Sequence, residues 1–76
     1  MKRVLVVDDE PIVRIGLRTV VPWEEYGFHI AGEASNGLDG LKLAEVLRPE
    51  IIIADILMPG MDGFEFINRV RKILPE

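Results

Sequence analysis

Apolar positions along the chain alternate between two periods, one typical of buried strands and the other typical of helices. Continuous apolar runs at 4–7 and 51–55 (the second closing on an acid) predict strands buried on both faces. A shorter, less apolar run at 29–34 predicts another strand between them. Helical spacing follows each strand, over 11–21, 36–47 and 62–74. The order βαβαβα implies a parallel sheet with right-handed crossovers.

The ends of the helices carry their own signals. Pro11 suits the first turn of a helix, with Asp9 or Glu10 just before it as a cap. This first helix has apolar residues along two stripes, so we expect it to be well buried. Asp62, followed by Glu65 three residues later, has the spacing of a capping box and predicts the start of the last helix.

Composition narrows the functional classes. With 76 residues the chain is one small domain, and 49% apolar with 29% charged residues excludes a disordered tail or a collagen-like repeat. A net charge of −4 disfavours unaided binding to nucleic acid or anionic membranes. The lack of cysteine excludes disulfides, thiolate chemistry and a cysteine-based zinc site. The apolar runs are too short to cross a bilayer, so we expect a cytoplasmic protein without membrane contact.

Three acids follow predicted strands. Asp8 and Asp9 close the first strand, and Asp55 closes the third. In open α/β sheets, ligands bind beyond the carboxyl ends of the strands, so the three carboxylates should converge if these two strands are neighbours. Such a cluster needs a compensating cation or proton, and an all-oxygen donor set favours Mg²⁺.

A plainer interpretation treats these acids as local features. Asp9 could cap the following helix, and Asp8 could be an ordinary loop acid. That interpretation explains Asp55 poorly, because Asp55 follows four apolar positions and precedes Ile56, where burial penalises an idle charge.

Two segments carry a family resemblance. VLVVDDE at 4–10 and IIIADILMPGMDGFEF at 51–66 resemble the receiver domain of two-component response regulators. The resemblance implies a flavodoxin-like (CheY-like) parallel sheet with strand order 2-1-3. It makes Asp55 the acceptor of a phosphoryl group from a histidine kinase, and it assigns Mg²⁺ to Asp9, Asp8, Asp55 and the backbone carbonyl of Leu57. It also implies a module that catalyses only its own phosphorylation and is not otherwise an enzyme.

Departures from the family pattern qualify this picture. The chain resembles only the first three of the family's five βα units, without the hydroxyl residue and the lysine that end the fourth and fifth strands. These 76 residues are therefore expected to be switch-incompetent, and an exposed edge at 51–53 should favour self-association.

The output and two alternatives stay open. The segment 23–28 with 29–34 resembles receivers attached to AraC-type regulators, which suggests control of transcription, with DNA bound only through an effector domain outside these residues. One alternative is a non-phosphorylated assembly or dimerisation module. The other is a Mg²⁺-dependent phosphohydrolase, which usually has a second Asp two residues after the nucleophile, where this chain has Leu57.

Overall fold

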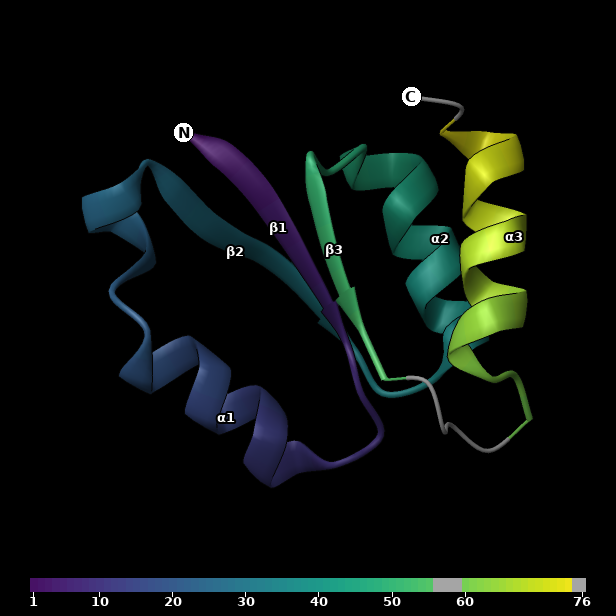
Figure 1. Cartoon of the computed structure of the whole chain (residues 1–76), viewed down its shortest axis with the longest axis horizontal. Helices are drawn as coiled ribbons and strands as arrows, with labels where there is room; N and C mark the ends of the chain where they lie inside the picture. Colours follow the sequence, from purple (N-terminus) through teal and green to yellow (C-terminus); the bar gives the residue numbers. More distant parts are fainter. Residues whose placement is uncertain (56–59, 75–76) are drawn as a thin grey trace.

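The fold alternates strands with helices, as the sequence pattern predicts. The computed structural model describes residues 1–55 and 60–74 (Figure 1). Its elements are β1 (Lys2–Val7), α1 (Pro11–Val20), the 3₁₀ helix η1 (Trp23–Tyr26), β2 (Phe28–Ala34), α2 (Gly37–Leu47), β3 (Ile51–Ala54) and α3 (Gly63–Ile73). None of the helices within these residues has the length and apolar character needed to span a membrane.

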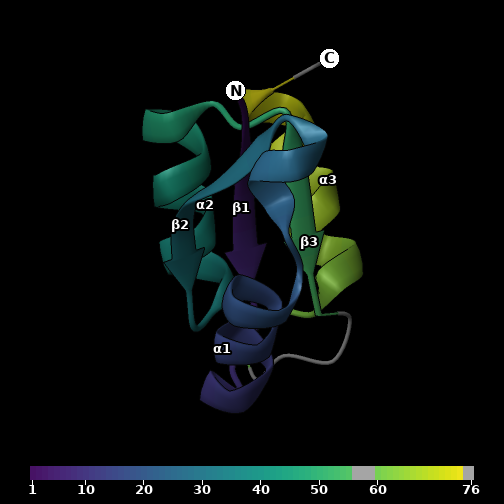
Figure 2. The same cartoon turned by 90° about the vertical axis from the view of Figure 1, so that its left-hand side faces the viewer.

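The sheet has the predicted strand order, with β1 in the centre. The order is β2-β1-β3 and both pairings are parallel. Figure 2 shows β1 between its two neighbours. The register sets Val7 beside Ala34 of β2 and beside Ala54 of β3, so all three strands end at the same level. This shared end places the loops after β1 and β3 next to each other.

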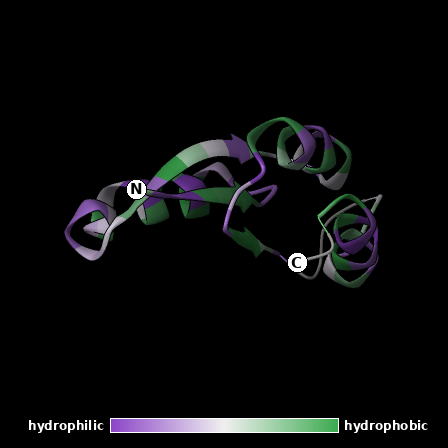
Figure 3. Cartoon of the chain, turned by 90° about the horizontal axis from the view of Figure 1, so that it is seen from above, coloured by the Kyte–Doolittle hydropathy of each residue, from purple (hydrophilic) through white to green (hydrophobic). Residues whose placement is uncertain are grey.

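One face of the sheet carries the main apolar cluster. α2 and α3 lie together on this face (Figures 1 and 3). Alternation along β1 points Leu5 and Val7 toward them, and both side chains are fully buried. The rest of the buried cluster comes from β2, the two helices and the turn before α3, namely Ala34, Leu41, Ala44, Met61 and Phe66.

A glycine allows α2 to approach the sheet closely. A Cβ built on Gly40 would lie 2.8 Å from Val7 Cγ2 and 2.9 Å from Phe66 Cε1. These distances are shorter than a carbon–carbon contact allows, so a larger residue here would push α2 away from β1 and α3. Gly40 therefore lets three elements of the core meet at one point.

The opposite face is covered differently, and here one prediction was wrong. α1 was expected to be well buried, yet none of its residues is buried, and Ile12 and Val20 are 81% and 79% exposed. The helix lies near the carboxyl ends of the strands, on the face away from α2 and α3 (Figures 1 and 2). Apolar periodicity in α1 therefore indicated a helix correctly, but not how much of it the fold covers.

Two smaller differences concern the inner faces of the other helices. Leu38 and Ile67 are 55% and 44% exposed, although the sequence pattern suggests inward positions for both. In α2, Leu41 and Ala44 are buried as the apolar spacing predicts, but they are joined by Gly37 and Gly40 and not by Leu38. A glycine has no side chain and therefore does not register in a pattern of apolar residues. The stripe of α2 that contacts the sheet is for this reason rotated from the expected one.

Candidate metal centre

The carboxyl ends of β1 and β3 position two of the predicted acids. The backbone N–H of Asp8 donates to Ala34 O at 3.0 Å, and that of Asp55 donates to Val7 O at 3.0 Å. Each acid therefore extends a ladder of the sheet by one residue. Both are partly buried, which sets their carboxylates at the rim of the sheet instead of in bulk solvent.

Four carboxylates meet at this rim. Asp8, Asp9, Glu10 and Asp55 each offer a carboxylate oxygen, and these oxygens all lie within 4.8 Å of one another. The structure thus brings together the three aspartates singled out in the sequence. Glu10 is a fourth acid that sequence reasoning did not include, although it follows Asp9 directly in the same turn.

The turn after β1 has a different local structure from the predicted helix cap. Glu10 occupies the cap position of α1 but makes no capping hydrogen bond with its side chain, so the expectation that Asp9 or Glu10 caps the helix was wrong. Instead, Asp8 Oδ1 accepts a hydrogen bond from Glu10 N at 2.9 Å. This short-range bond curls the chain back, so that the following acids face β3.

The donor set fits a hard divalent cation. Two unit charges 4.8 Å apart repel by about 1 kcal/mol in water and about 3.5 kcal/mol at an effective dielectric of 20. Within the described part of the chain, no lysine or arginine forms a salt bridge with Asp8, Asp9 or Glu10. All four donors are oxygens, the ligand type that Mg²⁺ prefers, and Mg²⁺ needs only one or two carboxylates.

One predicted ligand is not part of this geometry. The backbone carbonyl of Leu57 was assigned to Mg²⁺ by family resemblance, and Leu57 lies outside the described residues. Its role therefore stays a prediction.

Comparison with known proteins identifies the family of the chain. The family model of the response regulator receiver domain matches residues 4–76, and the chain belongs to that family. BvgA of Bordetella pertussis, whose name describes a transcription regulator of virulence factors, is 39% identical over 71 residues. The match covers 93% of this chain and 33% of BvgA.

Two solved structures extend the likeness to three dimensions. The receiver domain of AraT, a response regulator from Geobacillus stearothermophilus, has a TM-score of 0.92 and 36% identity, covering 99% of this chain and 58% of that one. A two-component transcriptional regulator AraC from Clostridium phytofermentans has a TM-score of 0.90 and 32% identity, covering 99% and 60%. The chain thus spans about a third of BvgA and under two thirds of these solved chains. These likenesses confirm the predicted CheY-like fold and the predicted resemblance to AraC-type regulators.

Proposed function

We propose that the chain accepts a phosphoryl group on Asp55 from the phosphohistidine of a histidine kinase, in a reaction that depends on Mg²⁺. A carboxylate oxygen of Asp55 forms the new P–O bond as the P–N bond to the kinase histidine breaks, and the imidazole leaves with that electron pair. The product is an acyl phosphate. In this role the chain promotes its own modification and turns over no substrate, and DNA would be bound only through an effector domain outside these residues.

The chain's own residues supply position and charge. Asp8, Asp9 and Asp55 would hold Mg²⁺, with the Leu57 carbonyl as a further predicted ligand, and Glu10 is close enough to assist through water. Bound Mg²⁺ supplies the positive charge that lets an anionic phosphoryl group approach these carboxylates. The observation that carries the proposal is the gathering of four carboxylate oxygens within 4.8 Å at the ends of β1 and β3.

Acetyl phosphate offers a test without a kinase. With Mg²⁺ present, intact-mass measurement should detect one added phosphoryl group that hydroxylamine removes, as expected for an acyl phosphate. Asp55→Asn should abolish the adduct, and chelation of Mg²⁺ should do the same. Asp62→Asn is the matched control, because Asp62 lies outside the carboxylate cluster and asparagine retains its capping ability.

Three outcomes would contradict the proposal. Labelling that persists in Asp55→Asn would reject that residue as the acceptor. Repeated turnover of a phosphoester would favour the phosphohydrolase. Failure to bind Mg²⁺ at millimolar concentration would favour a module that only assembles.

The proposal also places the protein in the cytoplasm, where ATP-dependent kinases act, and fractionation of cells checks this.

A second part of the proposal concerns self-association of these 76 residues. β3 pairs only with β1 in the described sheet, and Ile51 at its start is 37% exposed. An exposed apolar edge strand offers a template for another chain, so we propose a dimer, or an exchange of elements, through β3. Sedimentation at micromolar concentration should detect it, and Ile51→Lys should weaken it. A stable monomer would contradict it.

This 76-residue polypeptide is also proposed to be switch-incompetent: once labelled, it should show no shift in backbone amide resonances away from the carboxylate cluster.

A further inference from the structure

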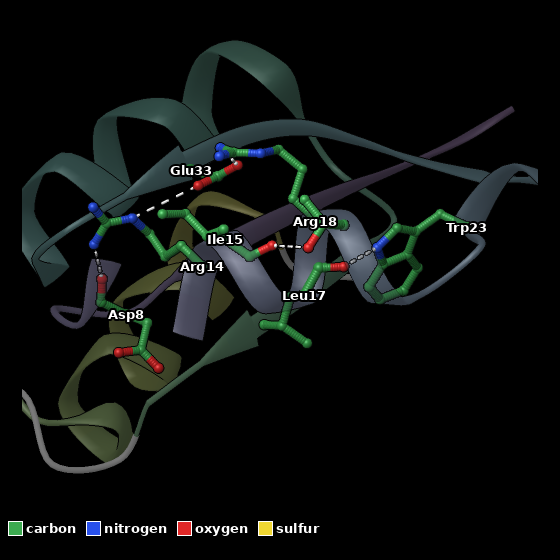
Figure 4. Close-up of polar contacts among 8 residues, drawn as sticks. Asp8, Arg14, Ile15, Leu17, Arg18, Trp23 and Glu33 are labelled. Atoms are coloured by element: carbon green, nitrogen blue, oxygen red, sulfur yellow. Dashed lines mark hydrogen bonds and ion pairs between the residues drawn. The ribbon is translucent and has the colours of Figure 1, made fainter. Parts of the chain in front are cut away.

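An ionic network joins α1 to β2 beside the carboxylate cluster (Figure 4). The carboxylate of Glu33 in β2 forms salt bridges with two arginines of α1. Arg14 Nε lies 3.6 Å from Glu33 Oε1, and Arg18 Nη1 lies 2.8 Å from Glu33 Oε2. The side chains of Arg14 and Glu33 are each only 19% exposed, whereas that of Arg18 is 52% exposed. The Arg14–Glu33 contact is therefore the one that solvent screens least.

Arg14 also contacts the turn that carries the acids. Its Nη1 donates to the backbone oxygen of Asp8 at 2.6 Å, and Figure 4 shows the guanidinium between Asp8 and Glu33. The peptide groups of Asp8 are thus held from two sides, because its N–H donates to Ala34 of β2. Ala34 directly follows Glu33, so both links tie the same part of β2 to the same turn.

The positive charge of Arg14 and its hydrogen bond to the acidic turn have different partners. Glu33 compensates the guanidinium, and Arg14 hydrogen-bonds the carbonyl of Asp8. Meanwhile the four acids repel one another, which favours a spread turn. A charge-assisted bond to the Asp8 carbonyl opposes that spreading.

We propose that Arg14 is a positioning residue for the carboxylate cluster: held by Glu33, it fixes the Asp8–Glu10 turn so that the acids converge on a cation. The cation in this inference rests on the proposed function, whereas the ordering of the turn by Arg14 does not depend on that function. Arg14 acts through the backbone oxygen of Asp8.

The sign of a change in Mg²⁺ affinity distinguishes positioning from charge. If Arg14 acts by its charge, Arg14→Gln removes a cation near the site and Mg²⁺ binds more tightly. If it positions the turn, Arg14→Gln raises the Mg²⁺ dissociation constant about tenfold, as for other groups that orient metal ligands. Arg14→Lys should also raise it, because one ammonium group does not reproduce the planar fork. Isothermal titration with MgCl₂ measures the dissociation constant for the wild type, Arg14→Gln and Arg14→Lys.

Arg18→Gln is the matched control. Arg18 lies on the same helix and contacts the same Glu33, but none of its contacts in the described chain reaches Asp8. Its substitution should change the dissociation constant less than about twofold, because the side chain is solvent-exposed and screened. An equal effect of both variants would overturn the proposal.

Hydrogen exchange in the metal-free chain gives a second measure. Arg14→Gln should speed amide exchange at Asp8 and Glu10 relative to Leu5 and Val6 in β1, and Arg18→Gln should not. If Arg14→Gln unfolds the chain, Arg14→Lys serves for both measurements. Unchanged exchange and affinity in a folded Arg14 variant would overturn the inference. Faster exchange in a chain whose wild type binds no Mg²⁺ would reject the proposed function while supporting the ordering of the turn.

Discussion

The two faces of the sheet are held in different ways. On the α2–α3 face, fully buried side chains from β1 and α3 form a continuous apolar cluster. On the α1 face Val4 and Val6 of β1 are fully buried, but no residue of the helix is. The hydrogen bonds and ion pairs of α1 are with Glu33 (Arg14 and Arg18), with Asp8 (Arg14) and with Trp23, whose Nε1 donates to Leu17 O at 2.8 Å (Figure 4).

This difference suggests a division of labour. Apolar burial is non-directional and supplies most of the free energy of folding. Hydrogen bonds and ion pairs contribute less net free energy but constrain distance and angle. The acidic turn after β1 needs defined geometry, and it is the polar face that contacts it. We therefore expect substitutions on the α2–α3 face to change stability, and those in the α1 network to change the site.

The largest expected effect comes from truncating the centre of the core. Phe66 is fully buried, so Phe66→Ala should lower the free energy of unfolding by about 3–5 kcal/mol. Ile12→Ala on α1 should change it by less than about 0.5 kcal/mol, since Ile12 is 81% exposed. Urea denaturation followed by circular dichroism measures both. Similar losses for the two variants would show that α1 packs as tightly as α3.

The same glycine-to-alanine change should have opposite signs on the two faces. In α2, the new methyl of Gly40→Ala would meet Val7 and Phe66, and overpacking of this kind costs about 1–3 kcal/mol. In α1, nothing lies within 4 Å of a Cβ on Gly16. Gly16→Ala should therefore stabilise the chain by about 0.5–1 kcal/mol through helix propensity alone. Two changes of the same sign in thermal unfolding would contradict the comparison.

Helix capping provides a smaller contrast. Asn36 Oδ1 accepts from Asp39 N at 2.8 Å at the start of α2, so Asn36→Ala should cost about 1 kcal/mol. Glu10 makes no such bond at the start of α1, and it lies among other acids. Glu10→Ala should therefore leave the free energy of unfolding unchanged or slightly higher. A loss equal to that of Asn36→Ala would show that Glu10 has a structural role.

Much of this architecture could be predicted from the sequence. Continuous apolar runs placed β1 and β3, helical spacing placed α2 and α3, and Asp62 caps α3 through Glu65 N as its spacing indicated. These features are local, so a short segment contains the information. The convergence of Asp8, Asp9 and Asp55 required only that β1 and β3 be neighbours, which follows from the family resemblance.

Other features depend on contacts between distant segments. The exposure of α1 depends on what covers it, and its own periodicity carries no such information. Glu10 joins the carboxylate cluster because Asp8 curls the turn, a short-range bond that competes with helix capping. The Arg14–Glu33 contact links residues 19 positions apart in number across α1 and β2, and no spacing rule pairs them.

The smallest expected effect tests whether exposed polar contacts alone stabilise the chain. Glu50, directly before β3, accepts a hydrogen bond from Arg3 N, which lowers the pKa of its carboxyl below the ordinary value of 4.5. The folded state therefore favours the charged form, and its small stabilising effect is complete above that value and is lost as the pH falls through the lowered pKa. Urea unfolding of the wild type and Glu50→Gln from about pH 6 to about pH 3 should show a small difference in stability that vanishes at the acid end. Because Glu50 is solvent-exposed, a difference as large as that for Phe66→Ala would mean that polar contacts can hold this fold as strongly as its core, and the contrast between the two faces would fail.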